Sequence, residues 1–389
     1  MITPPLNPLR LPPLSLYIHI PWCVQKCPYC DFNSHAQKGT IPEQAYVRHL
    51  LTDLTADLSR YQESVQQRPL HSIFIGGGTP SLFSAENIAF LLHQIEQRIP
   101  FAPHIEITLE ANPGTAEAER FLGYVQAGVN RISMGIQSFS DEKLQKLGRI
   151  HNAAEAKSAV GFARVSSLRS FNLDLMHGLP NQTLNEALDD LRQAIELAPP
   201  HLSWYQLTIE PNTMFAYRQP KLPDDDELWD IFEQGHQLLT AAGYQQYETS
   251  AYAKSGFQCQ HNLNYWRFGD YLAIGCGAHG KLSFPNGKIL RYSKTKHPKG
   301  YMRGEYLYEE RDVSTEDRPF EFFMNRFRLL EAVPKGEFEQ FTGLPLSAVE
   351  NTMAWAQDQK FITETDRTWQ VTEHGKLFLN ELLEAFLPE

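Results

Sequence analysis

Residues 16–30 of this 389-residue chain read LYIHIPWCVQKCPYC. Most of the first five residues are apolar, aromatic or β-branched, as in a buried β-strand, and Pro21 follows where such a strand would end. Cys23, Cys27 and Cys30 then fall in one short loop, separated by three and two residues. The segment therefore predicts a strand that brings three thiols to a single site.

Thiols at this spacing indicate a metal centre rather than disulfide bonds. The chain has five cysteines, and Cys259 and Cys276 stand apart from the cluster of three. Iron–sulfur clusters are held by closely spaced thiolates, and three ligands for four irons leave one iron open to a further ligand. A structural zinc site with a distant fourth ligand is the alternative. The spacing and the preceding strand favour a [4Fe-4S] cluster.

The segments around this motif alternate between strand-like and helix-like patterns. Helical apolar spacing is found in residues 85–98 and 184–197, between candidate strands. This order is typical of an α/β fold with a parallel sheet, right-handed crossovers and a closed or partly closed (β/α)6 barrel. The predicted strands are residues 16–20, 72–76, 106–111, 131–136, 170–176 and 203–209.

Polar and glycine residues follow the ends of these strands. They include residues 21–30, 77–80, 110–114, Gln137 and residues 174–180. Carboxyl ends of parallel strands meet at one edge, where the functional site of such a fold lies. We therefore expect one rim to carry the chemistry.

The motifs resemble those of the radical S-adenosylmethionine superfamily, whose hallmark is a Cys-x3-Cys-x2-Cys loop. Tyr29 fits the aromatic residue that packs near the adenine, and residues 76–80, GGGTP, resemble the glycine motif. The resemblance implies a [4Fe-4S] cluster on Cys23, Cys27 and Cys30. It also implies that the glycines let the backbone approach the cofactor and offer N–H groups to its carboxylate.

Within the superfamily, the chain is most similar to the group of oxygen-independent coproporphyrinogen III oxidases and HemW-type haem chaperones. The resemblance spans nearly the whole chain through residues 17–21, 133–139, 148–149 and 172–180. Buried carboxylates need polar or cationic partners, and Arg149 is the expected cation. Gln137 could alternatively cap a strand end. The contacts implied for S-adenosylmethionine are Tyr17, Tyr29, Gly77, Gly78, Thr79, Glu110, Gln137, Arg149 and Asp174.

Two departures separate the chain from the oxidases of this group. First, the segment before the motif is short compared with the oxidases: only 22 residues precede Cys23, and Arg10 is their sole arginine. Second, Phe32 stands where the oxidases have a further cysteine. Residues 261–265, HNLNY, resemble the HNxxY motif of the haem chaperones. The resemblance implies His261 as an axial haem ligand assisted by Tyr265, with His279 as the second choice.

We therefore interpret the chain as a haem chaperone that carries a cluster and S-adenosylmethionine and passes haem to acceptor haemoproteins, membrane-bound ones among the candidates. The alternatives are a radical enzyme resembling coproporphyrinogen oxidase and a zinc-stabilised regulator. The start of the chain matches no targeting signal, and no apolar run suits a membrane span, which favours the cytoplasm.

The domain layout follows from composition. We expect an N-terminal tail at residues 1–13 and a barrel at 14–295, with a haem-site segment at 244–281 that flanks its mouth. Residues 300–389 should form a smaller helical, winged-helix-like lid or docking domain. This last part has 9 Lys and Arg against 18 Asp and Glu, and the whole chain has a net charge of −11. Nucleic acid is therefore not the expected partner.

Overall fold

The computed structural model describes residues 8–37, 39–114 and 120–388, and a twelve-stranded sheet dominates it. Six neighbouring strands at its centre run parallel, each pairing with the next one along the chain. They are the six strands that the alternation predicts, with shifted ends. Their bounds are β1 Leu14–Ile20, β4 Leu70–Gly77, β5 Phe101–Ala111, β6 Arg131–Gln137, β7 Ser170–His177 and β8 His201–Gln206.

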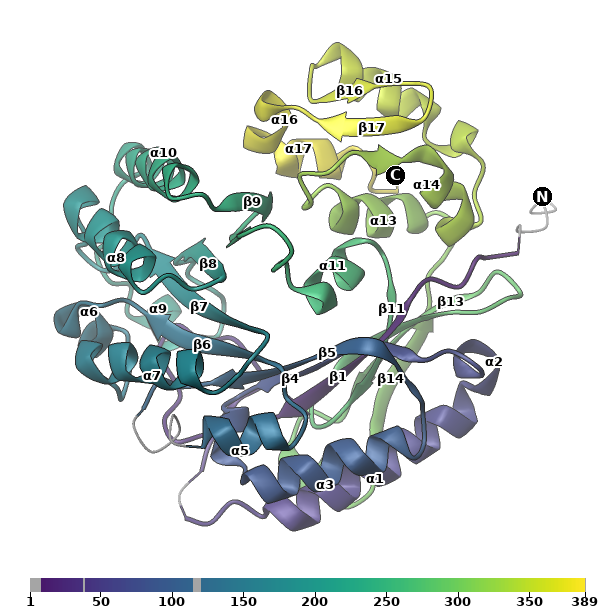
Figure 1. Ribbon diagram of the computed structural model, residues 1–389. Helices are drawn as coiled ribbons and strands as arrows, with labels where there is room; N and C mark the ends of the chain where they lie inside the picture. The colour runs from purple at the N-terminus through teal and green to yellow at the C-terminus, as the bar shows by residue number, and fades with distance from the viewer. Residues whose placement is uncertain (1–7, 38, 115–119, 389) are drawn as a thin grey trace.

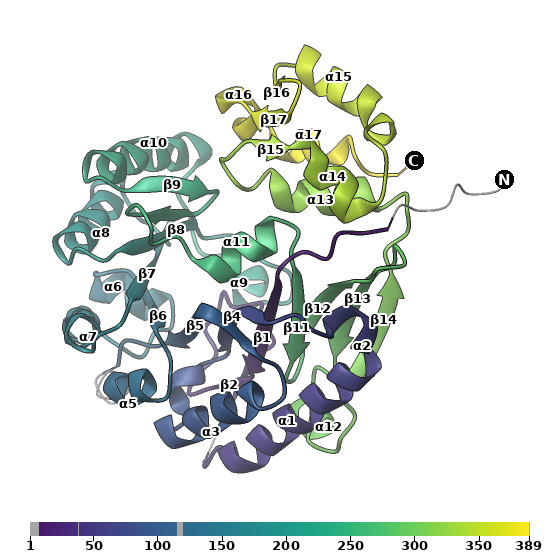
Figure 2. The same cartoon turned by 45° about the vertical axis from the view of Figure 1, so that its right-hand side comes forward.

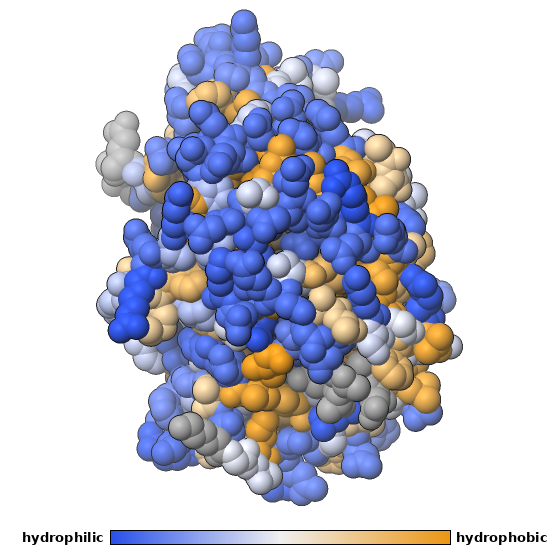
Figure 3. All heavy atoms as spheres, turned by 90° about the vertical axis from the view of Figure 1, so that its left-hand side faces the viewer, coloured by the Kyte–Doolittle hydropathy of each residue, from blue (hydrophilic) through white to orange (hydrophobic). Residues whose placement is uncertain are grey.

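Helices cover the outer face of the parallel strands (Figure 1). In α8 (Leu184–Glu196), Ala187, Leu191 and Ala194 are buried on one face, and Thr183 caps the first turn. The outward surface of this side of the molecule is mostly hydrophilic (Figure 3). The other helices before residue 245 are α1 Glu43–Arg60, α2 Gln62–Val65, α3 Ala85–Glu96, α5 Phe121–Gln126, α6 Asp141–Lys146, α7 Ala153–Val165, α9 Met214–Tyr217 and α10 Asp225–Ala241.

Later segments extend the sheet at both edges. Strand β10 (Ala251–Ala253) pairs antiparallel with β8, and β9 (Gln245–Glu248) pairs with β10. Strand β11 is parallel to β1, and antiparallel strands follow it. In the described residues β9 and β14 are the free edges, so the sheet is open, as in a partial barrel. These strands are β11 Asp270–Ile274, β12 His279–Ser283, β13 Ile289–Lys294 and β14 Leu307–Asp312.

Helix α11 (Gln260–Trp266) lies against the sheet on the side away from α1 and α3 (Figure 2). It packs on β1, β4 and β11 and also touches α13 (Arg318–Arg326) of the C-terminal part. The segment between β10 and β11 is therefore positioned over the same face as the strand ends. The short helix α12 (Pro298–Tyr301) lies between β13 and β14.

The C-terminal part has the element order of a winged helix: two helices flank a short strand, and a further helix precedes a hairpin. Its core contains Phe322, Phe323, Phe338 and Trp369 and also includes Phe268 from the chain after α11. The final helical stretch is divided at Phe378 into two short helices. The elements after α13 are β15 Val333–Pro334, α14 Lys335–Thr342, α15 Glu350–Asp358, β16 Ile362–Glu364, β17 Thr368–Val371, α16 Glu373–Leu377 and α17 Leu379–Glu384.

In the described ranges, none of the helices combines the length and the apolar character needed to cross a bilayer.

Candidate functional site

The three motif cysteines lie in one loop after β1. Strands β2 (Trp22–Cys23) and β3 (His35–Ala36) pair in parallel and fold the loop back on itself. Inside the loop, the Cys30 amide donates to the Cys27 carbonyl at 3.2 Å. The three thiols form no disulfide, and all of them line one cavity of about 300 Å³.

This donor set fits an iron–sulfur cluster. Burial raises the pKa of Cys23, and the Thr79 side chain only partly opposes the rise, so this thiol stays protonated without a metal. Within the described residues, no three His, Cys, Asp or Glu side chains are grouped closely enough to hold a single metal ion. Three thiols around one cavity match the closely spaced thiolate ligands of iron–sulfur clusters.

The glycine motif at the end of β4 packs tightly against the cysteine loop. A Cβ on Gly77, whose φ is +116°, would lie 2.5 Å from the His19 ring, and one on Gly78 would lie 2.6 Å from the Trp22 carbonyl oxygen. The Gly78 amide donates to Ile20 and the Thr79 amide to Trp22. These two amides therefore join β4 to the cysteine loop.

Glu110 and Asp174 both line the cysteine cavity, but Arg149 pairs with neither. The Gly77 amide donates to Glu110 Oε2 at 3.0 Å. Ser133 Oγ donates to Asp174 Oδ2 at 2.9 Å. Burial and the nearby Asp174 raise the pKa of Glu110 to about 7, and burial also raises the pKa of Asp174. Amide and hydroxyl donors therefore take the place of the expected cation.

Arg149 instead faces the cysteine loop. Its Nη2 donates to Asn112 Oδ1 at 2.7 Å and to the Gly135 carbonyl at 2.8 Å. Its Nη1 lies 3.5 Å from Cys27 Sγ. Burial acts to lower the pKa of Arg149, but the neighbouring Tyr29 and Cys27 outweigh it and raise the pKa. Arg149 is therefore a buried cation held beside the cysteine loop.

Gln137 ends β6 at a register irregularity and has a φ of +68°, a left-handed conformation for a residue with a side chain. Its Oε1 accepts a hydrogen bond from Tyr205 Oη at 2.9 Å. Sequence reasoning missed both Tyr205 and Asn112, which line the cavity. The alternation of inward residues along β8, Ser203 then Tyr205, could have indicated the tyrosine.

A second cavity of about 830 Å³ adjoins the first. Both cavities are lined by Cys30, Phe32, Ser34, Gly77 and Glu110. The structure places Tyr17 in this second cavity and not in the cysteine-lined one, with Tyr17 Oη 3.0 Å from His19 Nδ1. Tyr17 is thus separated from the other predicted S-adenosylmethionine contacts.

Inward-facing polar side chains of the sheet hold α11 in place. His261 Nδ1 lies 2.9 Å from Ser72 Oγ, and the His261 amide donates to Glu106 Oε1 at 3.1 Å. Asn264 Nδ2 donates to Ser15 Oγ at 2.8 Å. These contacts depend on residues that β1, β4 and β5 turn toward the concave side of the sheet.

His261 borders the second cavity and is only 6% exposed. Burial, and then the positive charge of Arg131, lower its pKa to about 3, so the imidazole is neutral at physiological pH. Its ring lies 5.2 Å from the Phe74 ring, and Nε2 has no hydrogen-bond partner among the described residues. A neutral imidazole with one nitrogen held and the other free is suited to metal ligation.

Tyr265, four residues further along α11, also lines the second cavity. Its ring lies 4.7 Å from that of Tyr271. His279, at the start of β12, lines the same cavity and is exposed. All three predicted haem-site side chains therefore border one space, with His261 deepest.

Comparison with known proteins places the chain in a family. The family described as the Radical SAM superfamily matches residues 17–194, and that of the HemN C-terminal domain matches residues 313–378. "Heme chaperone HemW" of Haemophilus influenzae is 79% identical and covers 98% of this chain and 99% of its own length. This chain belongs to the HemW family.

Other relatives agree with this assignment. The HemW protein of Escherichia coli is 66% identical over 98% of this chain and 100% of its own length. Among solved structures, the HemW-family chain resembles coproporphyrinogen III oxidase (HemN) from Escherichia coli, a radical SAM enzyme, with a TM-score of 0.81. The match covers 97% of this chain and 90% of the oxidase at 22% identity, which shows a shared fold.

Proposed function

We propose that this protein is a haem chaperone, which binds haem and transfers it to acceptor haemoproteins while carrying a [4Fe-4S] cluster and S-adenosylmethionine. One observation carries the proposal. The cysteine-lined cavity and the cavity bordered by His261 adjoin and share lining residues, Cys30, Gly77 and Glu110 among them. A cluster site and a candidate haem ligand on one continuous rim would be difficult to explain in a zinc-stabilised regulator.

In this proposal the cysteines hold the cluster and the remaining polar lining holds S-adenosylmethionine. The cluster, when bound, offers one open iron to that cofactor and can pass it an electron. Arg149 keeps a cation beside Cys27, while Asn112 and Gly135 fix its orientation. The residues proposed to surround S-adenosylmethionine are Tyr29, Gly77, Gly78, Thr79, Glu110, Gln137, Arg149 and Asp174, with Tyr17 reaching from the adjoining cavity.

The larger cavity would receive haem. Its volume of about 830 Å³ is within the range of cavities that take cofactors. His261 would ligate the iron through Nε2 while Ser72 orients the ring through Nδ1. Tyr265 would contact or orient the bound haem from the same helix.

We also propose the setting in which the protein acts. The cytoplasm is the expected compartment, and acceptor haemoproteins, including membrane-bound ones, are the expected partners. The acidic residues 300–389 would form the docking or lid domain, and their excess of Asp and Glu disfavours nucleic acid as a ligand.

A haem titration tests the proposal. His261→Ala should weaken haem affinity by about tenfold or more and change the Soret spectrum, because an axial bond is lost. His236→Ala is the matched control, since His236 lines neither cavity and bonds Tyr252 on another part of the fold. Iron and sulfide content should be unchanged in both variants. An unaltered haem spectrum and affinity in a folded His261→Ala protein would contradict the ligand assignment and favour His279.

A further inference from the structure

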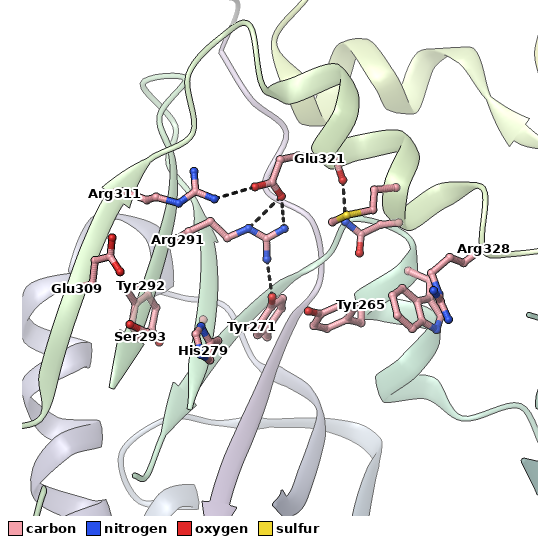
Figure 4. Close-up of a pocket in the computed structure, with 14 residues that line it drawn as sticks. Tyr265, Tyr271, His279, Arg291, Tyr292, Ser293, Glu309, Arg311, Glu321 and Arg328 are labelled. Carbon is pink, nitrogen blue, oxygen red and sulfur yellow. Dashed lines mark hydrogen bonds and ion pairs between the residues drawn. The ribbon is translucent and has the colours of Figure 1, made fainter. Parts of the chain in front are cut away.

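A third cavity, of about 520 Å³, lies between the edge strands β12 to β14 and helix α13. It adjoins the cavity that we assign to haem, because Tyr265, Trp266, Tyr271 and His279 line both. Figure 4 shows Tyr271 and Tyr265 beneath two arginines from the sheet and one glutamate from α13. A flat ligand in the haem cavity could therefore extend its periphery into this space.

Arg291 and Arg311 both donate hydrogen bonds to the Glu321 carboxylate, as arginines do to carboxylates in general. Glu321 Oε2 accepts hydrogen bonds from Nε, at 3.1 Å, and from Nη2 of Arg291, and its Oε1 accepts one from Arg311 Nη2 at 3.2 Å. Arg291 Nη1 also donates to Tyr271 Oη at 2.6 Å. Planar guanidinium groups with several N–H donors are well suited to binding carboxylates. The site is thus already shaped for a carboxylate, and the protein supplies one of its own.

Further donors around the cavity lack partners. Arg328 Nε and Trp266 Nε1 are buried and have no hydrogen-bond partner among the described residues. The Arg328 guanidinium stacks over the Trp266 ring at 4.5 Å. Buried donors without acceptors are costly, so these groups favour a ligand that brings acceptor oxygens. Arg291, Arg311 and Arg328 also outnumber the two lining carboxylates, Glu309 and Glu321.

We propose that this third cavity binds the carboxylate groups of haem and that Glu321 occupies the arginine pair when haem is absent. The proposal rests on haem binding in the adjoining cavity. A haem carboxylate would replace the Glu321 carboxylate on Arg291 and Arg311, so no net charge is buried or lost in the exchange. Haem loading would thereby break one contact between the sheet and α13, which belongs to the acidic C-terminal part.

The rest of that interface can survive the exchange. Arg267 and Glu331 form an ion pair at 2.6 Å, and Arg318 Nη2 donates to the Gly287 carbonyl at 2.8 Å. Phe268 also belongs to the core of the C-terminal part. Removing the Glu321 charge should therefore leave the protein folded.

The experiment compares haem with haem dimethyl ester, which keeps the iron and the ring but lacks free carboxylates. In Glu321→Gln, haem affinity should rise about tenfold or more, the order of one charge-assisted hydrogen bond, while ester affinity stays unchanged. In Arg311→Gln, haem affinity should fall while ester affinity again stays unchanged. Arg311 is half exposed, so this variant keeps the fold intact.

Glu331→Gln is the matched control. It removes the Arg267–Glu331 ion pair between the same two parts of the molecule, together with the Arg326–Glu331 pair, but Glu331 does not line the cavity. Glu331→Gln should change neither the affinity for haem nor the affinity for its dimethyl ester. Equal responses of haem and ester in Glu321→Gln, or no response of either, would overturn the carboxylate site while leaving haem binding itself intact. Absence of haem binding in the unmodified protein would instead overturn the proposed function and this site together. The preference for haem over its ester should persist in His261→Ala, which separates carboxylate recognition from iron ligation.

Discussion

Cys23, Cys27 and Cys30 should each be required for the proposed cluster, since each would supply a thiolate and no other cysteine lines this cavity in the described residues. Alanine at any one of them should make the cluster labile, so that iron and sulfide per chain and the brown absorbance fall toward background. Cys259 and Cys276 are buried elsewhere, where Cys259 donates to Glu106 and Cys276 to the Lys296 carbonyl. Cys259→Ala and Cys276→Ala should retain the cluster. Full iron content in all three motif variants would refute the assignment.

Glu110 should make S-adenosylmethionine binding depend on pH. Burial and the nearby Asp174 raise the pKa of Glu110 to about 7, so the carboxylate that would attract the cationic sulfonium and ammonium groups forms as pH rises. Affinity should increase between about pH 6 and about pH 7.5. Glu110→Gln should flatten that dependence and weaken binding by about tenfold, the order of a charge-assisted hydrogen bond. Calorimetric titration of the reconstituted protein measures both.

The raised pKa of Glu110 also affects the stability of the unliganded protein. A carboxyl group whose pKa is raised on folding favours the folded state while it is protonated in that state. The stability that Glu110 contributes to the folded state is therefore lost as pH rises through about 7. Thermal unfolding of the unliganded protein should show this loss, and Glu110→Gln should reduce it. If the unfolding midpoint of Glu110→Gln changed with pH as steeply as that of the unmodified protein, the assignment would be contradicted.

At single positions, sequence reasoning found the groups but not their pairing. Glu110, Arg149 and Asp174 all line the cysteine cavity as the motifs predict. Arg149 was one of the partners considered for the buried carboxylates, the other being polar ligands, but its Nη2 bonds Asn112 and the Gly135 carbonyl instead. Such pairing depends on side-chain directions across neighbouring strands, which spacing along one chain does not encode.

The end of β4 depends on the absence of a side chain at Gly77. Gly77→Ala should destabilise the protein by about 1–3 kcal/mol or more, because a Cβ would meet the His19 ring and the positive φ is strained. Gly243→Ala is the matched control, since Gly243 has a φ of +83° and an added Cβ there would meet no atom within 4 Å. Gly243→Ala should lower the stability of the protein only through backbone strain. Chemical denaturation of both variants measures the difference, and equal losses would contradict the role assigned to the contact.

Strands and helices with strong periodicity were predictable. The six parallel strands and α8 follow from β-branched runs and a helical apolar stripe, and their ends differ from the prediction by a few residues. Strands β9 to β14 were not predicted as parts of the sheet. Strands β10 and β11 are short and join the sheet through β8 and β1, and β1 lies far away along the chain, so local composition indicated only an aromatic-rich segment. The break at Phe378 likewise interrupts an apolar pattern that reads as one helix.

The candidate site is formed by segments that are distant in sequence. The cysteine loop, the end of β4, helix α11 and the start of β12 all border the second cavity. Motif order indicated that the strand ends share a rim, but it gave no information on how α11 fills the concave side of the sheet. That arrangement follows from contacts such as Ser72 with His261 and Ser15 with Asn264, which exist only once the sheet has formed.

A shared fold does not imply a shared reaction, and this distinction yields the last prediction. The chain has the fold of coproporphyrinogen III oxidase at 22% identity, yet Phe32 stands where the resemblance to the oxidases implies a further cysteine. Phe32 is 62% exposed and lines both the cysteine cavity and the haem cavity, so the difference falls within the site itself. We therefore expect no conversion of coproporphyrinogen III by the reconstituted, reduced protein under anaerobic conditions.

The same preparation should bind haem, which separates a missing activity from a damaged protein. The Escherichia coli oxidase, assayed in parallel, provides the positive control for substrate and reductant. Chromatography of the porphyrin products after oxidation measures turnover directly. Formation of protoporphyrinogen well above background would overturn the chaperone assignment, because the geometry around Phe32 would then support the oxidase reaction. Haem binding without turnover is the outcome that a carrier requires, since a carrier must release its haem chemically unchanged.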